Sequence, residues 1–424
     1  MSKDKATCSF CGRQIDREKI KNEEDYIFIG SNESILICGE CVKECNAILA
    51  EEERKKLGTT SNIKSGITPK SIKANLDEWI IGQNEAKKAL SIALYNHYKR
   101  LNQPKDKNDL AIEKSNIILV GSTGSGKTAS VSALAKSMDL PFVIEDVTSI
   151  SSTGYVGRDT EDILKNLISA ANGDIEKAQT GIVLLDEGDK LKREKNSSGA
   201  RDVKGEGVQQ GLLKMVEGGV FDVKMKGGVK KFDTTNVLFI LGGAFEGIEK
   251  LIAKRLNKKD KTTKVGFTAK MDNQKKDIQK YNELIVQVKH EDLKEFGMMP
   301  ELLGRFPVLT ALEELSEEAL VSILTQPKNA IIKQYKKMFN EDNVDLEFSN
   351  EALIAIAKEA RERKIGARAL RSIVEEVLKE PMFEVPGSKI SKVTIDKNLK
   401  VVYSEEKQLS FDDIDLDFSL TNKE

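Results

Sequence analysis

The sequence is organised around the stretch Ile117-Ile118-Leu119-Val120-Gly121-Ser122-Thr123-Gly124-Ser125-Gly126-Lys127-Thr128. Its four leading apolar residues predict a buried parallel strand. They run directly into the pattern G-x-x-x-x-G-K-T, and residues 129–136 have the composition of a helix. Strand, glycine-rich loop and helix in this order predict a phosphate-binding P-loop rather than a chance glycine-rich turn.

The residue types in this loop suit a nucleoside triphosphate. Glycines let the backbone turn its N–H groups toward phosphate oxygens, and the helix that follows adds the positive end of its dipole. We expect Lys127 to reach the β- and γ-phosphates and the Thr128 hydroxyl to bind Mg²⁺. The predicted ATP-binding residues of the loop are Gly121, Ser122, Thr123, Gly124, Ser125, Gly126, Lys127, Thr128 and Ala129.

A second apolar run, residues 181–185, ends in Asp186 and Glu187. After a P-loop this is the pattern of a Walker B strand. Asp186 would hold Mg²⁺ through water, and Glu187 would orient or deprotonate the water that attacks the γ-phosphate. A third apolar strand over residues 236–241 ends in Gly242-Gly243. Strands that alternate with helices predict an α/β fold with a parallel sheet flanked by helices.

Two helices are predicted before the P-loop. The first opens at Thr68-Pro69 and ends near Trp79, and the second spans residues 85–101 with one apolar face. Trp79 is expected to pack in the core. Ile80 and Ile81 are candidates to clasp the adenine ring of ATP, and packing in the core is the equal alternative.

Length and composition exclude several classes of protein. A chain of 424 residues suggests roughly three domains. The formal net charge is −1, so no global basic field points to nucleic acid as a partner. No apolar run has membrane-spanning length, and the N-terminus has no signal-peptide pattern. We therefore expect a soluble intracellular protein, without membrane or nucleic-acid partners.

Four of the five cysteines form two C-x2-C pairs, Cys8 with Cys11 and Cys38 with Cys41. Four thiolates in this spacing predict a structural Zn²⁺ site, with disulfides as the alternative. A module this small is typical of a docking or dimerisation unit. Cys45 lies outside the pattern and is expected to be a small buried apolar residue rather than a fifth ligand.

The motifs occur in a specific order: the four-cysteine module, Ile81-Gly82-Gln83, residues 95–100, the P-loop, Gly-Tyr-Val-Gly at 154–157, Leu-Asp-Glu at 185–187, residues 201–210, Gly-Gly-Ala-Phe at 242–245, Pro-Glu-Leu-Leu-Gly-Arg at 300–305, and Gly-Ala-Arg-Ala-Leu-Arg at 366–371. This set resembles the ClpX protein unfoldases of the AAA+ class over nearly the whole chain. The resemblance implies an N-terminal zinc-binding domain (1–50), a flexible linker (51–66), a large AAA+ ATPase domain (67–310), a small, mainly helical C-terminal domain (311–403) and an acidic, disordered tail (404–424).

The resemblance also assigns roles that spacing alone does not. Tyr155 and Val156 would grip a polypeptide in a central pore, and Arg201 and Val203 would belong to a second pore loop. For Tyr155, local packing in a tight turn is the alternative. Arg305 resembles the arginine finger that reaches a neighbouring subunit, and Arg368 resembles the nucleotide-sensing arginine of the small domain. For either arginine the alternative is a surface salt bridge. Val265, Gly266 and Phe267 resemble the loop that docks on the ClpP peptidase ring.

The function that the resemblance implies is ATP-dependent unfolding. A homo-hexamer in a bacterial-type cytosol would use ATP and Mg²⁺ to unfold substrate proteins and to thread them into a ClpP-type peptidase. Zn²⁺ would be held in the N-terminal module, and adaptors are further candidate partners. The catalytic residues would be Lys127, Asp186, Glu187 and Arg305, and the chain would not itself be a peptidase. Two rival classes are an AAA+ nucleic-acid motor with a zinc finger and a remodeller of protein complexes that works without a peptidase.

Three features depart from the family's pattern. Residues 224–232 are shorter than the family's loop at the pore entrance, which puts recognition of its degradation tags in doubt. Gly188 stands where the family usually has a bulky apolar residue, so looser local packing is expected. From Glu405 onward acidic and apolar residues alternate, which predicts a solvated tail or a peptide that binds an adaptor or another copy.

Overall fold

The computed structural model describes residues 5–12, 14–16, 28–32, 35–39, 41, 42, 44, 45, 67–101, 112–150, 160–193, 205–225, 228–259, 273–363 and 365–405. The chain divides into two compact units, Met1–Ser65 with Leu101–Lys105, and Gly66–Arg100 with Asp106–Glu424. Among the described residues, we find no helix with the length and apolar character needed to span a bilayer.

A five-stranded parallel sheet forms the centre of the second unit. Its strand order is β11 (Val308–Ala311), β5 (Ile117–Val120), β10 (Leu238–Gly243), β7 (Ile182–Asp186) and β6 (Phe142–Asp146). β5 and β10 are buried along their whole length, which explains why they are continuous apolar runs rather than alternating ones. The predicted parallel sheet is confirmed.

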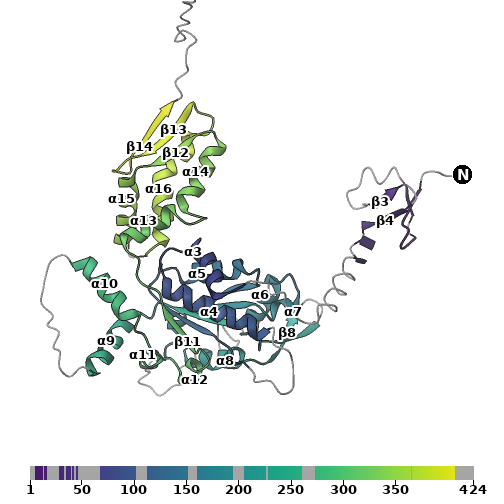
Figure 1. Cartoon of the computed structure of the whole chain (residues 1–424), viewed down its shortest axis with the longest axis horizontal. Helices are drawn as coiled ribbons and strands as arrows, with labels where there is room; N and C mark the ends of the chain where they lie inside the picture. Colours follow the sequence, from purple (N-terminus) through teal and green to yellow (C-terminus); the bar gives the residue numbers. More distant parts are fainter. Residues whose placement is uncertain are drawn as a thin grey trace, which may run out of the picture. The chain divides into compact units, whose positions relative to one another are not determined.

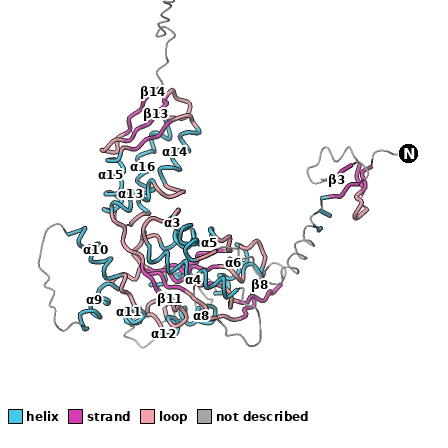
Figure 2. The backbone as a smooth tube through the Cα atoms, in the orientation of Figure 1, coloured by secondary structure: helices cyan, strands magenta, loops and turns pink. Residues whose placement is uncertain are grey.

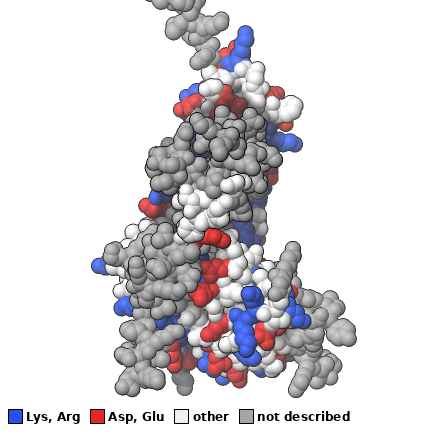
Figure 3. Space-filling model, turned by 90° about the vertical axis from the view of Figure 1, so that its right-hand side faces the viewer, with Lys and Arg blue, Asp and Glu red and all other residues white. Residues whose placement is uncertain are grey.

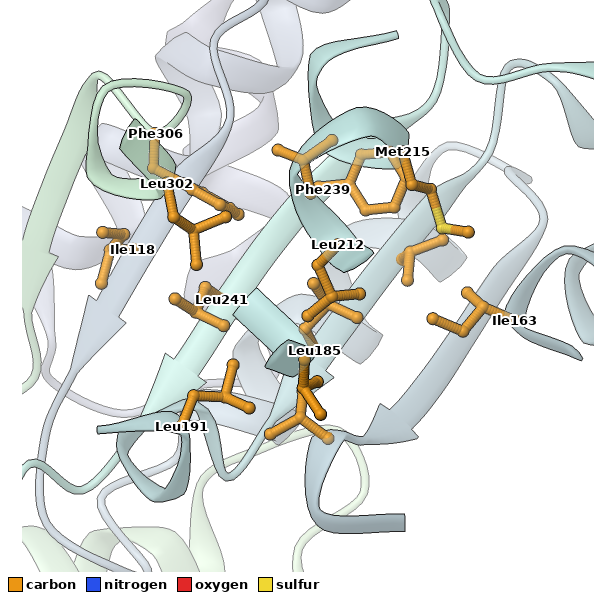
Figure 4. Close-up of a cluster of buried hydrophobic side chains, with 14 of the residues drawn as sticks. Ile118, Ile163, Leu185, Leu191, Leu212, Met215, Phe239, Leu241, Leu302 and Phe306 are labelled. Carbon is orange, nitrogen blue, oxygen red and sulfur yellow. The ribbon is translucent and has the colours of Figure 1, made fainter. Parts of the chain in front are cut away.

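Helices cover both faces of this sheet, and the pleat of β5 shows how. Ile117 and Leu119 belong to a core with α3 (Pro69–Asp77), α4 (Asn84–Leu101) and α5 (Lys127–Ser137). Ile118 and Val120 point to the opposite core, with α6 (Thr160–Ala170), α8 (Glu206–Glu217), α9 (Ile248–Lys259), α11 (His290–Phe296) and α12 (Pro300–Leu303). Figure 4 shows the second core, where Leu212 and Met215 of α8 lie over Leu185 and Phe239.

The remaining elements of this part lie outside the five-stranded sheet. They are the 3₁₀ turns η1 (Val147–Ser149) and η2 (Gly188–Leu191), the short helix α7 (Ile175–Ala178), the hairpin β8 (Val220–Met225) and β9 (Gly228–Asp233), and α10 (Asn273–Ile285). α9 and α10 pack side by side (Figure 1). The hairpin carries the shortened segment at 224–232, in which Lys230 and Lys231 are exposed and residues 226 and 227 are not described.

The first helix begins as predicted, but its tryptophan is not in the core. The Thr68 side chain caps α3, and Pro69 occupies the first helical position, where its missing N–H costs nothing. The helix ends at Asp77, so Trp79 lies in the turn beyond the cap and is 38% exposed. The prediction for Trp79 was therefore wrong, because the turn carries its ring away from the buried face of Ile72 and Leu76.

The C-terminal part has its own hydrophobic core. It contains α13 (Glu317–Thr325), α14 (Ile331–Glu341), α15 (Asn350–Glu362) and α16 (Arg368–Glu384). The helices pack against a sheet of order β12 (Asp345–Phe348), β13 (Ile390–Ile395) and β14 (Val401–Glu405), as Figure 2 shows. The helical character was predicted, whereas the sheet was not. β14 also runs to Glu405, into the segment assigned to the tail.

The first unit holds two antiparallel hairpins among its described residues, β1 (Lys5–Thr7) with β2 (Gln14–Asp16) and β3 (Phe28–Asn32) with β4 (Ile35–Cys38). The predicted linker at 51–66 and the tail from 406 onward lie outside the described residues. On the face shown in Figure 3, acidic and basic side chains are interspersed.

Candidate ATP site and cysteine cluster

The P-loop joins the end of β5 to the start of α5. Gly124 and Gly126 have φ of 79° and 103°, in the left-handed region that glycine tolerates. A Cβ on Gly124 would run into the backbone of Ile365 and Gly366 from the C-terminal part. Gly126 caps α5 without a side-chain hydrogen bond, so the N–H groups of the first turn remain for a ligand such as phosphate.

Lys127 lies over this loop. Its side chain is 9% exposed, and its Nζ donates to the carbonyl oxygens of Gly121 and Ser122, the latter at 3.1 Å. Burial lowers the pKa of Lys127, and the carboxylates of Asp186 and Asp189 oppose that shift. The ammonium group is therefore buried and bonded only to neutral carbonyl oxygens. An anionic phosphate would bind it more strongly than these carbonyls do.

Thr128 and Asp186, predicted from separate motifs as Mg²⁺ ligands, are in contact. Thr128 Oγ1 donates to Asp186 Oδ2 at 2.9 Å. Glu187 follows β7 with φ of 59°, and its N–H donates to Asp186 Oδ1 at 2.9 Å. This hydroxyl–carboxylate pair provides oxygen ligands of the kind that Mg²⁺ prefers, so the residues present fit the ion.

One cavity of about 360 Å³ collects these groups. Arg368, the first residue of α16, lines it from the C-terminal part and makes no ion pair within the described part of the chain. The backbone closes the junction beside it, because Ala367 N–H donates to the Gly124 carbonyl at 3.2 Å. The lining residues are Thr123, Gly124, Gly126, Lys127, Thr128, Ala129, Asp186, Glu187, Gly243, Ala244, Ala367 and Arg368.

Three predicted residues lie elsewhere. Ile80 packs against the core of α3 and α4, and neither Ile80 nor Ile81 lines the cavity, so the adenine clasp stays a prediction. Arg305 does not line it either. Its guanidinium is half-exposed and pairs with Glu217 at 2.7 Å. Within one chain, Arg305 therefore makes the surface salt bridge that was its alternative role, and its action on a neighbouring subunit stays a prediction.

Two buried residues of the site had no predicted role. Asp189 is 3% exposed and accepts the Ala244 N–H at 3.0 Å, which fixes the end of β10 beside the cavity. Gln83 is 6% exposed, and its Nε2 donates to the carbonyl of Ser125 in the P-loop at 3.2 Å. Gln83 could have been found from the motif Ile81-Gly82-Gln83, which contains it. Asp189 follows Asp186 and Glu187 closely, but no sequence motif marks it as a functional residue.

The space beside Gly188 is filled rather than loose. A Cβ on this residue would lie 2.6 Å from Leu241 Cδ1 and 2.8 Å from Leu241 Cγ. The expectation of looser packing was therefore wrong, because Leu241 occupies the volume that a larger side chain at 188 would need.

The four predicted zinc ligands form one cluster in the first unit. Cys8 Sγ lies 3.9 Å from Cys41 Sγ, Cys11 Sγ lies 3.8 Å from Cys38 Sγ, and all four sulfurs are within 4.8 Å of one another. A tetrahedral site with Zn–S bonds of ~2.3 Å requires sulfurs ~3.8 Å apart, whereas a disulfide requires ~2.05 Å. The cluster therefore fits zinc and not disulfides, and Cys45 lies outside it.

The backbone around the cluster favours a bound cation. Hydrogen bonds from the Cys11 and Cys38 backbone lower the pKa of Cys8 to about 6. Burial and the neighbouring sulfurs raise the pKa of Cys41. Since metal ligands must be thiolates, a divalent cation offsets the repulsion that opposes ionising all four.

The predicted residues of the pore and of peptidase docking lie outside the described residues: Tyr155, Val156, Arg201, Val203, Val265, Gly266 and Phe267.

Known families match the two parts of the second unit separately. Residues 112–309 match the family described as "AAA domain (Cdc48 subfamily)", and residues 315–399 match the "C-terminal, D2-small domain, of ClpB protein". These matches confirm the AAA+ class of the fold.

Curated relatives match almost all of the chain, and the following three carry the name "ATP-dependent Clp protease ATP-binding subunit ClpX". The protein of Bacteroides thetaiotaomicron is 47% identical over 93% of this chain and 95% of its own length. That of Treponema denticola is 45% identical over 90% of each chain. That of Borrelia duttonii is 46% identical over 92% of this chain and 90% of its own length.

Proposed function

The chain belongs to the ClpX family of ATP-dependent Clp protease subunits, and from this we propose that it unfolds substrate proteins and threads them into a ClpP-type peptidase. It is an ATPase and not itself a peptidase. The observation that carries the proposal is the cavity in which Lys127, Thr128, Asp186 and Glu187 meet Arg368. Because Arg368 comes from the C-terminal part, a nucleotide there would contact both parts at once.

In this proposal each side chain at the cavity has one task. Lys127 leaves its carbonyl partners and binds the β- and γ-phosphates, while the free N–H groups of α5 hold phosphate oxygens. Mg²⁺ held by Thr128 and Asp186 would neutralise charge on those oxygens. Glu187 orients the attacking water and accepts its proton, and Asp189 keeps the Ala244 backbone in place beside it.

Arg368 would convert the state of the nucleotide into movement. Its attraction to the γ-phosphate disappears after hydrolysis, so the contact that draws the C-terminal part toward the P-loop weakens. The domain movement would drag Tyr155 and Val156 along a pore, with Arg201 and Val203 on a second loop, and Val265, Gly266 and Phe267 would dock on the peptidase. The proposal includes a homo-hexamer, since Arg305 would complete the site of a neighbour.

The cysteine module would bind Zn²⁺ through Cys8, Cys11, Cys38 and Cys41 and act as a docking or dimerisation unit for substrates or adaptors. A cytosolic location belongs to the same proposal, because unpaired metal-ligating cysteines persist in a reducing compartment. The domain boundaries given above, with the large ATPase domain at 67–310 and the small domain at 311–403, also remain part of it.

The test is the loss of fluorescence from a tagged, folded fluorescent protein. The mixture contains the full chain, Mg-ATP and a ClpP-type peptidase, with Glu187→Gln as the control that binds ATP and barely hydrolyses it. Loss that depends on ATP and is absent with the control supports unfolding and coupling to the peptidase together. Measurable ATPase without any loss, tested with several tags, contradicts the proposal.

Two variants separate gripping from docking. Tyr155→Ala should hydrolyse ATP and unfold poorly. Deletion of residues 265–267 should retain unfolding and lose degradation. If degradation survives the deletion, peptidase docking through this loop is wrong. Stimulation of the ATPase by DNA or RNA, with steep salt dependence, would instead favour a nucleic-acid motor.

A further inference from the structure

Only a short stretch of backbone connects the ATP-binding part to the C-terminal part. Leu312 N–H still donates to the Val120 carbonyl at 2.7 Å, so it extends the pairing of β11 with β5. Ser316 already caps α13, because its Oγ accepts the Ala319 N–H at 3.2 Å. Residues 313–315 are therefore the connecting segment, and any change in the angle between the two parts must alter their backbone.

Two side-chain amides hold the first two residues of this segment. Gln83 donates from Nε2 to the Glu313 carbonyl at 2.8 Å and accepts the Glu313 N–H on Oε1 at 2.9 Å. Asn282 of α10 does the same for Glu314, donating to its carbonyl at 3.1 Å and accepting its N–H at 2.7 Å. A side-chain amide has one donor group and one acceptor, so each satisfies both polar groups of one peptide residue.

Gln83 also reaches the nucleotide-binding loop. The same Nε2 that donates to Glu313 donates to the Ser125 carbonyl at 3.2 Å. Its backbone has φ of 55°, in a region that non-glycine residues seldom adopt, and its carbonyl accepts the Lys87 N–H in the first turn of α4. The turn that contains Gln83 is thus fixed on the ATP-binding part.

The same turn has a second contact with the C-terminal part. The Glu78 carbonyl accepts the Lys328 N–H at 2.9 Å, and the two side chains form an ion pair at 2.7 Å. Residues 78–83 therefore contact the P-loop, the connecting segment and the region after α13.

We propose that Gln83 and Asn282 form an amide clamp on the hinge, and that Gln83 couples the P-loop to it. Phosphate binding draws the P-loop N–H groups inward and turns the peptide planes that carry the Ser125 carbonyl. Gln83 Nε2 donates to both the Ser125 and the Glu313 carbonyls. A stronger or weaker hydrogen bond to Ser125 therefore changes the strength of the hydrogen bond to Glu313 in the hinge. Gln83 and Asn282 are positioning residues, since neither lines the cavity that holds the reacting groups.

This inference rests on the proposed ATP-driven domain movement. Its test measures the exchange of two backbone amides, so it needs neither the unfolding of a substrate nor a peptidase. Hydrogen–deuterium exchange of the peptide covering Glu313 and Glu314 is measured in the full chain, with and without Mg-ATPγS. The chains compared are wild type, Gln83→Met, Asn282→Ala and Asn282→Asp. Gln279→Ala is the matched control, because Gln279 is an exposed residue of the same helix.

Loss of the hydrogen bond that protects a backbone amide should speed its exchange roughly five- to tenfold. We expect this acceleration for Gln83→Met and Asn282→Ala and not for Gln279→Ala. Asn282→Asp keeps the acceptor for Glu314 N–H, so it should restore protection. Wild type and Asn282→Ala should respond to the nucleotide, whereas Gln83→Met should not.

Unchanged exchange in both Gln83→Met and Asn282→Ala would overturn the clamp. A response to the nucleotide in Gln83→Met equal to that of wild type would overturn the coupling. If Gln83→Met fails to fold, Asn282→Ala and Asn282→Asp still decide the clamp, and Gln83→Glu, which keeps one acceptor and loses the donor to Ser125, decides the coupling.

Discussion

At the scale of single residues, Gly188 and Leu241 compete for one volume next to Asp186 and Glu187, the proposed catalytic carboxylates. Gly188 follows Glu187 in η2, and Leu241 belongs to β10. We expect Gly188→Ile to destabilise the protein by roughly 1–3 kcal/mol, because the new side chain overpacks against Leu241. Leu241→Ala alone should cost about 2–5 kcal/mol through the cavity it leaves.

The double variant Gly188→Ile/Leu241→Ala should be more stable than the sum of the two single losses predicts, because the isoleucine fills the cavity that the alanine leaves. Thermal denaturation of the single and double variants measures the effect, and the ATPase rate shows whether Glu187 has moved. Additive losses in the double variant would contradict the shared volume, because independent sites add.

His97 gives the stability of the protein a dependence on pH. Burial, with the nearby charges of Arg100 and Lys114, lowers the pKa of His97 to about 3, although its ring contacts the Thr180 carbonyl. The unfolded chain takes up a proton near pH 6.5 and the folded chain does not, so stability is lost as the pH falls below 6.5. Between pH 7 and pH 5 this costs about 2 kcal/mol.

His97→Gln removes the titrating group and retains a polar side chain. We expect the Tm of wild type to fall between pH 7 and pH 5 by about 4–8 °C more than the Tm of His97→Gln. Equal decreases in the two proteins would show that His97 is protonated in the folded state.

At the scale of elements, the sulfur cluster holds a module with few other means of support. Its described hydrophobic cluster consists of Cys8, Cys38 and Cys41 with Ile37 packed against it. A module this small depends on metal for its folding energy. We expect a chelator to remove one zinc per chain, to expose the four ligand thiols to a thiol reagent, and to leave the ATPase rate unchanged, because the module is a separate compact unit.

Cys45→Ser is the matched control for this prediction, since Cys45 lies outside the cluster and should not affect zinc content. Cys41→Ser removes one of the four ligands and should abolish zinc binding. Full zinc binding by Cys41→Ser, or loss of ATPase together with zinc, would contradict the assignment.

Elements with strong local patterns could be predicted from the sequence. The apolar runs at 117–120 and 181–185 were predicted to be strands, and they form β5 and β7. Contacts that join distant residues could not be predicted. β12 pairs with β13 across two intervening helices, and Gln83 contacts Glu313 at a separation of 230 residues, for which no local pattern exists. Trp79 was missed because a turn, rather than periodicity, determines its exposure.

At the scale of the whole molecule, we proposed that Arg305 acts on the ATP site of a neighbouring subunit. Arg305 does not line the cavity of its own chain, and its pairing with the half-exposed Glu217 is a surface contact of little energetic value. It can therefore be withdrawn from Glu217 at small cost. If Arg305 serves a neighbour, each active site needs Glu187 from one subunit and Arg305 from the next.

Mixed rings test this division directly. Arg305→Ala alone and Glu187→Gln alone should each lose at least ~10²-fold in ATPase rate, because every site lacks one catalytic group. When the two variants are co-expressed, an Arg305→Ala subunit beside a Glu187→Gln subunit has its own Glu187 and receives an intact Arg305. With random assembly at equal amounts, about a quarter of the sites are complete, so the ATPase rate should return to a measurable fraction of the wild-type rate.

The control replaces Glu187→Gln by the double variant Glu187→Gln/Arg305→Ala, which forms rings but supplies no arginine and should give no recovery. If Arg305 acted within its own chain, no mixture of the two single variants would contain a complete site. Mixed rings as inactive as the separate variants would therefore contradict the assembly of the site from two subunits.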